Sequence, residues 1–156
     1  MGRLVLHTPL DVRLLERGMS VGEALAAFDA VNARSGGTAT FLGKVRGGQA
    51  KALELTHYEP LTLPGMQSLA EAAHARFELD GVLVWHRVGM MQPGDGIVLV
   101  AAAAPHRRAA FQAVDYLMDH LKSAAWFWKR ERRADGWHWI EPRADDHADL
   151  SRWTAG

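Results

Sequence analysis

Two apolar runs joined by a short polar segment place the firmest constraint on the fold of this chain. Residues 82–88 and 97–103 are rich in the residue types that favour strands. Between them lies Gln92-Pro93-Gly94-Asp95-Gly96, whose proline and glycines supply turn geometry. We therefore predict that the two runs pair as a β-hairpin.

Three other segments show the spacing of three and four residues between apolar side chains that indicates a helix. The first follows Ser20, where an acid three residues later completes a capping-box pattern. The second follows Pro64 and stops at Asp80-Gly81, and the third follows Pro105, which suits the first turn of a helix. The apolar positions are Val21, Leu25, Ala26 and Phe28 in the first, Met66, Leu69, Ala70, Ala73 and Phe77 in the second, and Ala110, Val114, Leu117, Met118 and Leu121 in the third.

Four further segments predict strands: residues 4–8, 38–45, 53–57 and 137–140. In the third of these, Leu53, Leu55 and His57 alternate with polar residues, as in a half-buried strand. Strands and helices interleave, but the hairpin and the short separations argue against a regular parallel βαβ series. We predict an α+β fold over residues 1–156, a single domain with a mixed or antiparallel sheet and flanking helices.

The composition excludes several classes of protein. The 156 residues are 48% hydrophobic, enough for an ordinary core without disulfides or a structural metal. There is no cysteine, so thiolate metal sites and a cysteine nucleophile are excluded, and any sulfur chemistry must import its sulfur. The longest apolar stretch, residues 97–105, is far shorter than the roughly 20 residues that cross a bilayer. With no cleavable apolar segment near the N-terminus, we expect a cytoplasmic protein without membrane contact.

Charges are separated along a chain whose formal net charge is zero. Residues 44–51 contain three Lys or Arg and no acid, and residues 106–133 contain seven against three acids, whereas acids dominate from Asp135 onward. This separation is compatible with a basic pocket for a small anion that the acidic tail, residues 142–156, neutralises or frames. A patchy solvated surface is the alternative.

Cations near the ends of the third predicted helix are candidate binding residues. His106-Arg107-Arg108 opens that helix, where free N–H groups and the helix dipole favour an anion. Lys122 falls near its C-terminal end, where a lysine also simply complements the dipole. If helical geometry persisted, Lys129 would share a face with Lys122, about two turns away.

Tryptophans beside these lysines suggest a chemical role. Walls made by Trp126 and Trp128 would remove water from an amine, lower its pKa and suit it to acid–base catalysis near neutrality. The alternative is that the aromatics pack in the core while the lysine stems cover them.

Signatures of other chemistries are missing. Gly43-Lys44 has neither the spacing of a phosphate loop nor the following Ser or Thr, because Val45 stands there. The sequence contains no dinucleotide fingerprint, no zinc-binding helical histidine pair and no nucleophile elbow. The eight histidines are scattered, and we predict neither a metal site nor a cofactor.

Six strings, in order and at compatible spacings, resemble the catalytic, large subunit of molybdopterin synthase, and the likeness is strongest over residues 38–141. They are Thr40-Phe41-Leu42-Gly43-Lys44-Val45-Arg46, Leu55-Thr56-His57-Tyr58, Trp85-His86-Arg87-Val88-Gly89, Pro93-Gly94-Asp95, Pro105-His106-Arg107 with Ala110-Phe111, and Leu121-Lys122 through Phe127-Trp128-Lys129-Arg130-Glu131.

This resemblance implies an α/β hammerhead fold and a sulfurtransferase of molybdenum cofactor biosynthesis. The reaction converts cyclic pyranopterin monophosphate into the dithiolene-bearing molybdopterin. Its sulfur donor is a small ubiquitin-fold subunit with a C-terminal Gly-Gly thiocarboxylate, and two large subunits form the central homodimer of a heterotetramer. Both substrates are anions, which agrees with a basic pocket.

The resemblance also implies roles for individual residues. We hypothesise that Lys122 is the principal acid/base and that Lys129 assists and positions, with His106 and Arg107 reaching the phosphate from the neighbouring protomer. The resemblance assigns substrate contacts to Lys44, Val45, Arg46, His106, Arg107, Arg130 and Glu131, catalysis and substrate contact to Lys122 and Lys129, and pocket shape to Phe41 and Met118, for which core packing alone is the alternative at Met118.

Two other functions remain compatible with these residues. The first is a binding module in which Trp126, Trp128, Trp137 and Trp139 stack on single-stranded nucleic acid, although a net charge of zero argues against it. The second is an inactive scaffold that only docks the ubiquitin-like partner, and the presence of both lysines argues against that. Steeply salt-dependent binding of oligonucleotides would identify the first.

Overall fold

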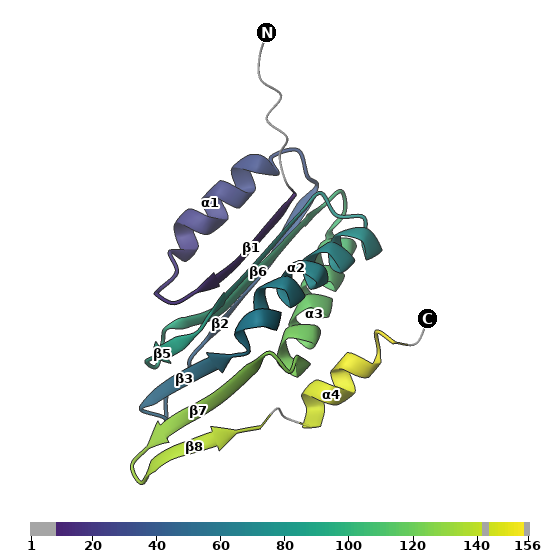
Figure 1. Ribbon diagram of the computed structural model, residues 1–156. Coiled ribbons are helices and arrows are strands. Elements are labelled where there is room, and N and C mark those ends of the chain that lie inside the picture. The colour runs from purple at the N-terminus through teal and green to yellow at the C-terminus, as the bar shows by residue number, and fades with distance from the viewer. Residues whose placement is uncertain (1–8, 142–143, 155–156) are drawn as a thin grey trace.

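The computed structural model describes residues 9–141 and 144–154, which form two four-stranded sheets and four helices (Figure 1). The first sheet has the order β1 (Leu10–Leu15), β4 (Gly81–Arg87), β6 (Gly96–Ala104), β2 (Gly37–Lys44). Its strands are antiparallel except for the parallel pair of β1 with β4. The second sheet is antiparallel, in the order β5 (Gly89–Met91), β3 (Ala52–His57), β7 (Phe127–Arg133), β8 (Gly136–Ile140). The predicted α+β class is confirmed.

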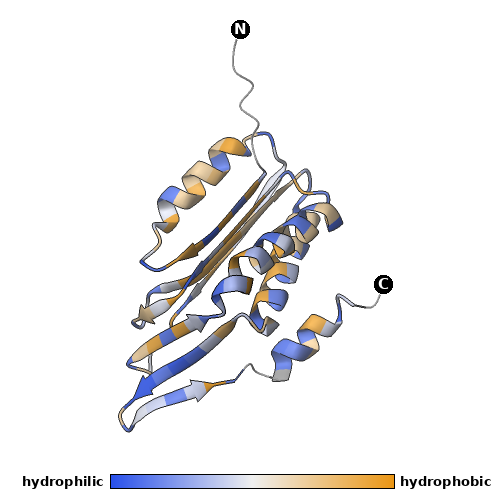
Figure 2. Cartoon of the chain, in the orientation of Figure 1, coloured by the Kyte–Doolittle hydropathy of each residue, from blue (hydrophilic) through white to orange (hydrophobic). Residues whose placement is uncertain are grey.

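The predicted hairpin is the centre of the first sheet. β4 and β6 pair antiparallel from Gly81 opposite Ala103 to His86 opposite Val98. Every residue of β4 is buried because helices cover both faces of the sheet. Figure 2 shows apolar residues concentrated in these central strands and a hydrophilic β7. The connection between β4 and β6 contains the short strand β5, which was not predicted and which pairs with β3 of the second sheet.

Three helices cover the first sheet and fix its two faces. Helix α1 (Val21–Val31) packs Ala24 and Phe28 against Leu83 and Leu99 on one face. On the other face lie α2 (Glu59–Arg76) and α3 (Arg107–Ser123), which form the larger core cluster with alternate residues of β4 and β6. The predicted helical segments and the predicted strands near residues 38–45, 53–57 and 137–140 are therefore confirmed.

Several predicted boundaries are wrong, and the predicted strand at residues 4–8 lies outside the described residues. Helix α2 starts at Glu59, and Pro60 lies in its first turn, where a proline gives up an N–H that has no helical partner. Pro64 lies inside the helix, where it removes one backbone hydrogen bond without ending the helix. Pro105 precedes the N-cap, His106, and so lies outside the first turn of α3. Ser20 is the N-cap of α1, but among the described residues its hydroxyl caps no backbone N–H.

Two further elements were not predicted. Strand β1 was missed although Leu10, Val12 and Leu14 alternate and pack against the larger core cluster, because charged residues stand between them. The acidic tail contains helix α4 (Ala144–Ser151), which packs against α3. Just beyond α4, Arg152 Nη2 and Trp153 Nε1 each donate to Asp119 Oδ2 of α3 at 2.6 Å.

No helix in the described ranges is long and apolar enough to cross a membrane.

We expect Gly65→Ala to destabilise the fold and Gly22→Ala to stabilise it. A Cβ at Gly65 in α2 would overlap the indole of Trp126, whereas a Cβ at Gly22 in α1 would meet no atom within 4 Å. Overpacking at Gly65 should lower the free energy of unfolding by about 1–3 kcal/mol. Alanine at Gly22 should raise it by about 0.4–1 kcal/mol. Urea unfolding followed by circular dichroism measures both, and equal effects of the two substitutions would contradict the packing described here.

Candidate active site

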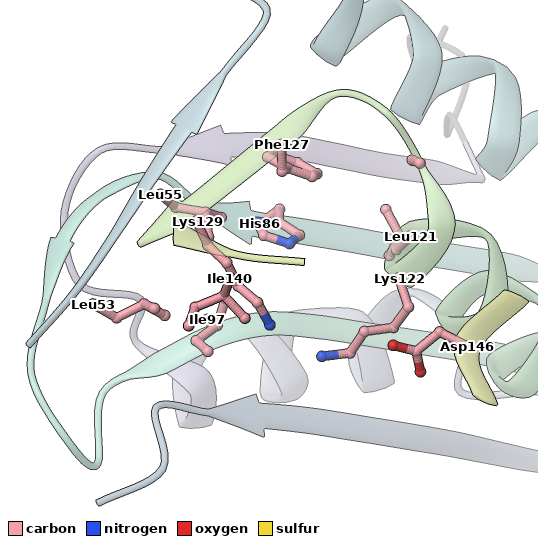
Figure 3. Close-up of a pocket in the computed structure, with 11 residues that line it drawn as sticks. Leu53, Leu55, His86, Ile97, Leu121, Lys122, Phe127, Lys129, Ile140 and Asp146 are labelled. Atoms are coloured by element: carbon pink, nitrogen blue, oxygen red, sulfur yellow. The ribbon is translucent and has the colours of Figure 1, made fainter. Parts of the chain in front are cut away.

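A pocket lies where the two sheets meet, beside the C-terminal end of α3 (Figure 3). Apolar side chains from both sheets form most of its wall, and two lysines, a histidine and an aspartate provide its ionisable groups. The lining residues are Leu53 and Leu55 of β3, His86 of β4, Ile97 of β6, Leu121 and Lys122 of α3, Ala124, Phe127 and Lys129 of β7, Ile140 of β8, and Asp146 of α4.

The two predicted catalytic lysines meet in this pocket, but not along one helix. Helix α3 ends at Ser123, and Ala124 is extended, with φ −71° and ψ 138°. Lys122 enters the pocket from the last turn of α3, while Lys129 enters from β7, where strand alternation turns it to the same side as Phe127. Figure 3 shows both amines directed into the space between these elements. The assumed helical continuation from Lys122 to Lys129 is wrong, but both lysines do line the same pocket.

Burial and charge lower the pKa of Lys129 below that of a solvated lysine. Desolvation is the largest cause, and the positive charge of Lys122 comes next. Asp146 and Glu131 act in the opposite direction, and Arg46 lowers the pKa further. An amine of this kind releases its proton more readily than an exposed lysine does.

The walls that desolvate Lys129 are not the predicted tryptophans. Trp126 packs against the larger core cluster, and Trp128 is 47% exposed on the outer face of β7, edge-on to Tyr58. Phe127, between them in sequence, lines the pocket instead, because alternate residues of a strand point to opposite faces.

His86 gives the pocket a buried imidazole that is neutral at physiological pH. Its Nδ1–H donates to the Arg87 carbonyl oxygen at 2.8 Å, and its ring stacks on Phe127 with centroids 4.0 Å apart. Burial lowers the pKa of His86 to about 4, and the charge of Lys122 acts in the same direction against the raising effect of the Arg87 carbonyl.

The end of β2 and the segment that follows it carry the predicted residues: Lys44 is the last residue of β2, and Val45 and Arg46 come directly after it. Val45 is buried in a small core cluster with Leu53 and Leu55, so its side chain supports the pocket wall from behind. Lys44 and Arg46 on either side of it are exposed. The charge of Arg46 nevertheless acts on Lys129, which connects this segment electrostatically to the pocket.

His106 and Arg107 are not brought to the lysine pocket within one chain. They begin α3, whereas Lys122 lies in its last turn, 16 positions away and so roughly 24 Å along the helix axis. They line a separate recess together with Gly36, Pro105 and Arg108. A phosphate held there could reach the lysines only across an interface with another chain.

The other predicted site residues do not line the pocket. Arg130 faces away from Lys129, where its Nε donates to Glu54 Oε1 at 2.9 Å. Glu131 accepts a hydrogen bond from Arg133 Nε at 2.7 Å and raises the pKa of Lys129. The ring of Phe41 is 41% exposed on β2.

Met118 and the pocket aspartate show where the sequence prediction was incomplete. Met118 packs against the larger core cluster, in agreement with the packing alternative. His86 and Asp146 were not predicted as pocket residues, although the acidic tail was expected to frame a basic pocket and Asp146 does so. Ser123 Oγ, which donates to the Asp146 carbonyl oxygen at 3.1 Å, helps to place it. Within the described ranges, no group of three or more His, Asp or Glu could hold a metal ion.

Comparisons with known proteins agree on one family. The model of the family described as "MoaE protein" matches residues 15–124. The molybdopterin synthase catalytic subunit of Caulobacter vibrioides is 46% identical over 144 residues, which cover 91% of this chain and 96% of that protein. The molybdopterin biosynthesis MoaE protein from Burkholderia ambifaria superposes with a TM-score of 0.80 at 37% identity, covering 94% of this chain and 99% of that one.

A third relative is similar in fold alone. It comes from a protein–protein complex of subunits 1 and 2 of molybdopterin-converting factor from Helicobacter pylori, with a TM-score of 0.70 at 19% identity. The match covers 85% of this chain and 91% of that one.

We expect Lys122→Gln to raise the pKa of Lys129. The substitution removes a positive charge that lowers this pKa while leaving the apolar walls in place. Lys51→Gln removes an exposed lysine that is not among the charges acting on Lys129 and serves as the control. Heteronuclear NMR titration of the lysine side chains measures the change, and an unaltered Lys129 midpoint in Lys122→Gln would contradict the coupling.

Acid should destabilise the protein through His86. The pKa of the His86 ring is 6.5 in the unfolded chain and about 4 in the folded protein. The unfolded chain therefore binds a proton first as the pH drops, and the free energy of unfolding falls through this window. The loss between pH 6.5 and pH 5 should be about 2 kcal/mol. His86→Gln should flatten the pH dependence, whereas His147→Gln, at an exposed position, should leave it unchanged. Urea unfolding at both pH values measures this, and equal slopes for His86→Gln and wild type would refute it.

Proposed function

Because the chain belongs to the MoaE family of molybdopterin synthase catalytic subunits, we propose that its lysine pocket is where sulfur enters the pterin substrate. The observation that carries the proposal is the convergence of Lys122 and Lys129 in a pocket with mostly apolar walls. The substrate is cyclic pyranopterin monophosphate, and the sulfur donor is the C-terminal thiocarboxylate of a small ubiquitin-fold subunit. The absence of cysteine from the chain agrees with an imported sulfur atom.

The two lysines supply positive charge and protons to this reaction. When the thiocarboxylate sulfur attacks a carbon of the pterin substrate, negative charge builds on the substrate, and an ammonium in a pocket with little water stabilises it strongly. In this proposal Lys122 is the principal acid/base, and Lys129 assists and positions. The lowered pKa of Lys129 supports a shared role, because its amine exchanges a proton near neutrality more easily than an exposed lysine does.

The phosphate of the substrate is bound by a second copy of the chain. His106 and Arg107 lie at the opposite end of α3 from Lys122 and so serve the lysine pocket of a neighbouring protomer rather than their own. Arginine suits this role because its planar guanidinium binds phosphate through two hydrogen bonds. The exposed Arg46, whose charge acts on Lys129, and the exposed Lys44 two positions before it add positive charge for the same anion. The catalytic unit is therefore a homodimer.

A small subunit at each end of this homodimer completes a heterotetramer. The fold shared with a chain from the complex of subunits 1 and 2 of molybdopterin-converting factor supports this assembly. The tail of the small subunit, with its Gly-Gly thiocarboxylate, enters the lysine pocket. The apolar lining residues contact its backbone and the lysines face its terminal anion.

We expect Lys122→Ala to lower product formation at least 100-fold, within the range for loss of a general acid or base. Lys129→Ala should lower it by about tenfold or more, and Lys51→Ala should leave it unchanged. The assay combines pyranopterin monophosphate with a thiocarboxylated small subunit and detects the fluorescent oxidised derivative of molybdopterin. Near-normal turnover by Lys122→Ala would refute the role of this lysine. Failure of the folded wild type with a competent partner would refute the proposed reaction and favour the scaffold or nucleic-acid alternative.

A further inference from the structure

We propose that Asp95, held by the buried guanidinium of Arg87, is a positioning residue that fixes the segment 44–46 and thereby sets Arg46 in place beside the lysine pocket. Neither residue lines the pocket, and neither has a role in the function proposed above. The part of this inference that concerns substrate rests on that proposed function. The part that concerns Arg46 and Lys129 does not.

The first link is a tight turn closed by Asp95. Pro93 and Gly94 occupy its two central positions, and the φ of Gly94 is +92°, as a type II turn requires. Asp95 N–H donates to the Gln92 carbonyl oxygen at 3.0 Å, and Gln92 N–H donates to Asp95 Oδ2 at 2.9 Å. The Asp95 carboxylate therefore adds a second hydrogen bond between Gln92 and Asp95, beside the backbone hydrogen bond of the turn.

The second link ties this turn to the core through Arg87. The Arg87 side chain is only 9% exposed, and its Nη1 lies 3.5 Å from Asp95 Oδ2. Its Nη2 donates to the Met90 carbonyl oxygen at 3.2 Å, and its Nε has no hydrogen-bond partner among the described residues. Within the part of the chain that the structure describes, Asp95 is the carboxylate partner of this buried and only partly satisfied cation, so the ion pair restrains the position of Asp95.

The third link is a two-bond clamp on Val45. Val45 N–H donates to the Asp95 carbonyl oxygen at 2.9 Å, and Gly94 N–H donates to the Val45 carbonyl oxygen at 2.9 Å. The regular register of β2 with β6 shifts just before this point, between Gly43 and Lys44. Beyond that shift, the two hydrogen bonds to the turn restrain the backbone of Val45, and Arg46 is the next residue in the chain.

Arg46 is the residue through which this positioning reaches the pocket. Its positive charge lowers the pKa of Lys129, although its own side chain is exposed. Charge effects between exposed and half-buried groups weaken steeply with distance and solvent. Loosening the turn should therefore weaken the effect of Arg46 on Lys129 and its contact with an anionic substrate.

The first experiment compares Asp95→Asn with Asp11→Asn, which removes an acid from an exposed ion pair with Arg13 on β1. The readout is the NMR titration of Lys129 in the protein without substrate. Losing a negative charge would by itself lower a lysine pKa, whereas displacing Arg46 raises it. We expect Asp95→Asn to raise the pKa of Lys129 and Asp11→Asn to leave it unchanged. An unchanged or lowered pKa in folded Asp95→Asn would overturn the proposal.

A second pair of variants tests the turn without altering any charge. Gly94→Ala and Gly136→Ala both place a side chain at a glycine with positive φ and open space around it, so their backbone strain is comparable. Only Gly94 lies in the turn that clamps Val45. We expect Gly94→Ala alone to raise the pKa of Lys129, and equal behaviour of the two variants would contradict the inference.

A double-mutant cycle with Arg46 identifies the route. Arg46→Ala should raise the pKa of Lys129, and adding Asp95→Asn should raise it no further if Asp95 acts through Arg46. In the synthase assay, Asp95→Asn should raise KM for the pterin phosphate about tenfold with kcat little changed. Additive pKa effects, or a KM equal to that of wild type, would overturn the route. Because the NMR readout needs no turnover, a failure of the proposed reaction would leave the pKa result interpretable.

Discussion

The burial of both faces of the β4–β6 hairpin is the constraint on which the rest of the structure depends. Strands with apolar side chains on both sides need cover on both sides, and α1 supplies one layer while α2 and α3 supply the other. His86 ends the register of this pair on the α2–α3 side, where Phe127 of β7 stacks on it. The contact between the two sheets is therefore also the inner wall of the lysine pocket.

The chemistry of the pocket follows from what surrounds its charges. Leu53, Leu55 and Ile140 remove water from Lys129, and the positive charge of Lys122 adds to the effect, so two cations share a space that favours an anion. Asp146 of α4 offsets part of that charge. In the proposed reaction, the anionic sulfur donor and the pterin phosphate supply the negative charge that this arrangement lacks.

The sequence predicted the elements better than their contacts. The central hairpin and the helical stripe from Ala110 to Leu121 were predicted because periodicity reports local burial directly. The start of α2 was missed because prolines usually interrupt helices, whereas Pro60 lies in the first turn, which tolerates proline, and the helix continues through Pro64. Both lysines were identified as candidates from their place near the helix end and beside tryptophans, and the family resemblance gave them a catalytic role. The assumed helical route between them was wrong. The spacing between Lys122 and Lys129 does not reveal that α3 ends between them and that Lys129 reaches the pocket from strand β7. His86 and Asp146 gave no local signal, since their role depends on the packing of distant elements.

The central claim is that lysines of one chain and the phosphate-binding residues of another form one site, and intersubunit complementation tests it most directly. Lys122→Ala and Arg107→Ala chains, each inactive alone, would be unfolded, mixed in equal amounts and refolded with the thiocarboxylated small subunit. A shared site gives each mixed dimer one intact pocket, so random mixing should restore roughly a quarter of wild-type activity. If both sets of residues served the same chain, the mixture would stay as inactive as its components, and the account would be contradicted.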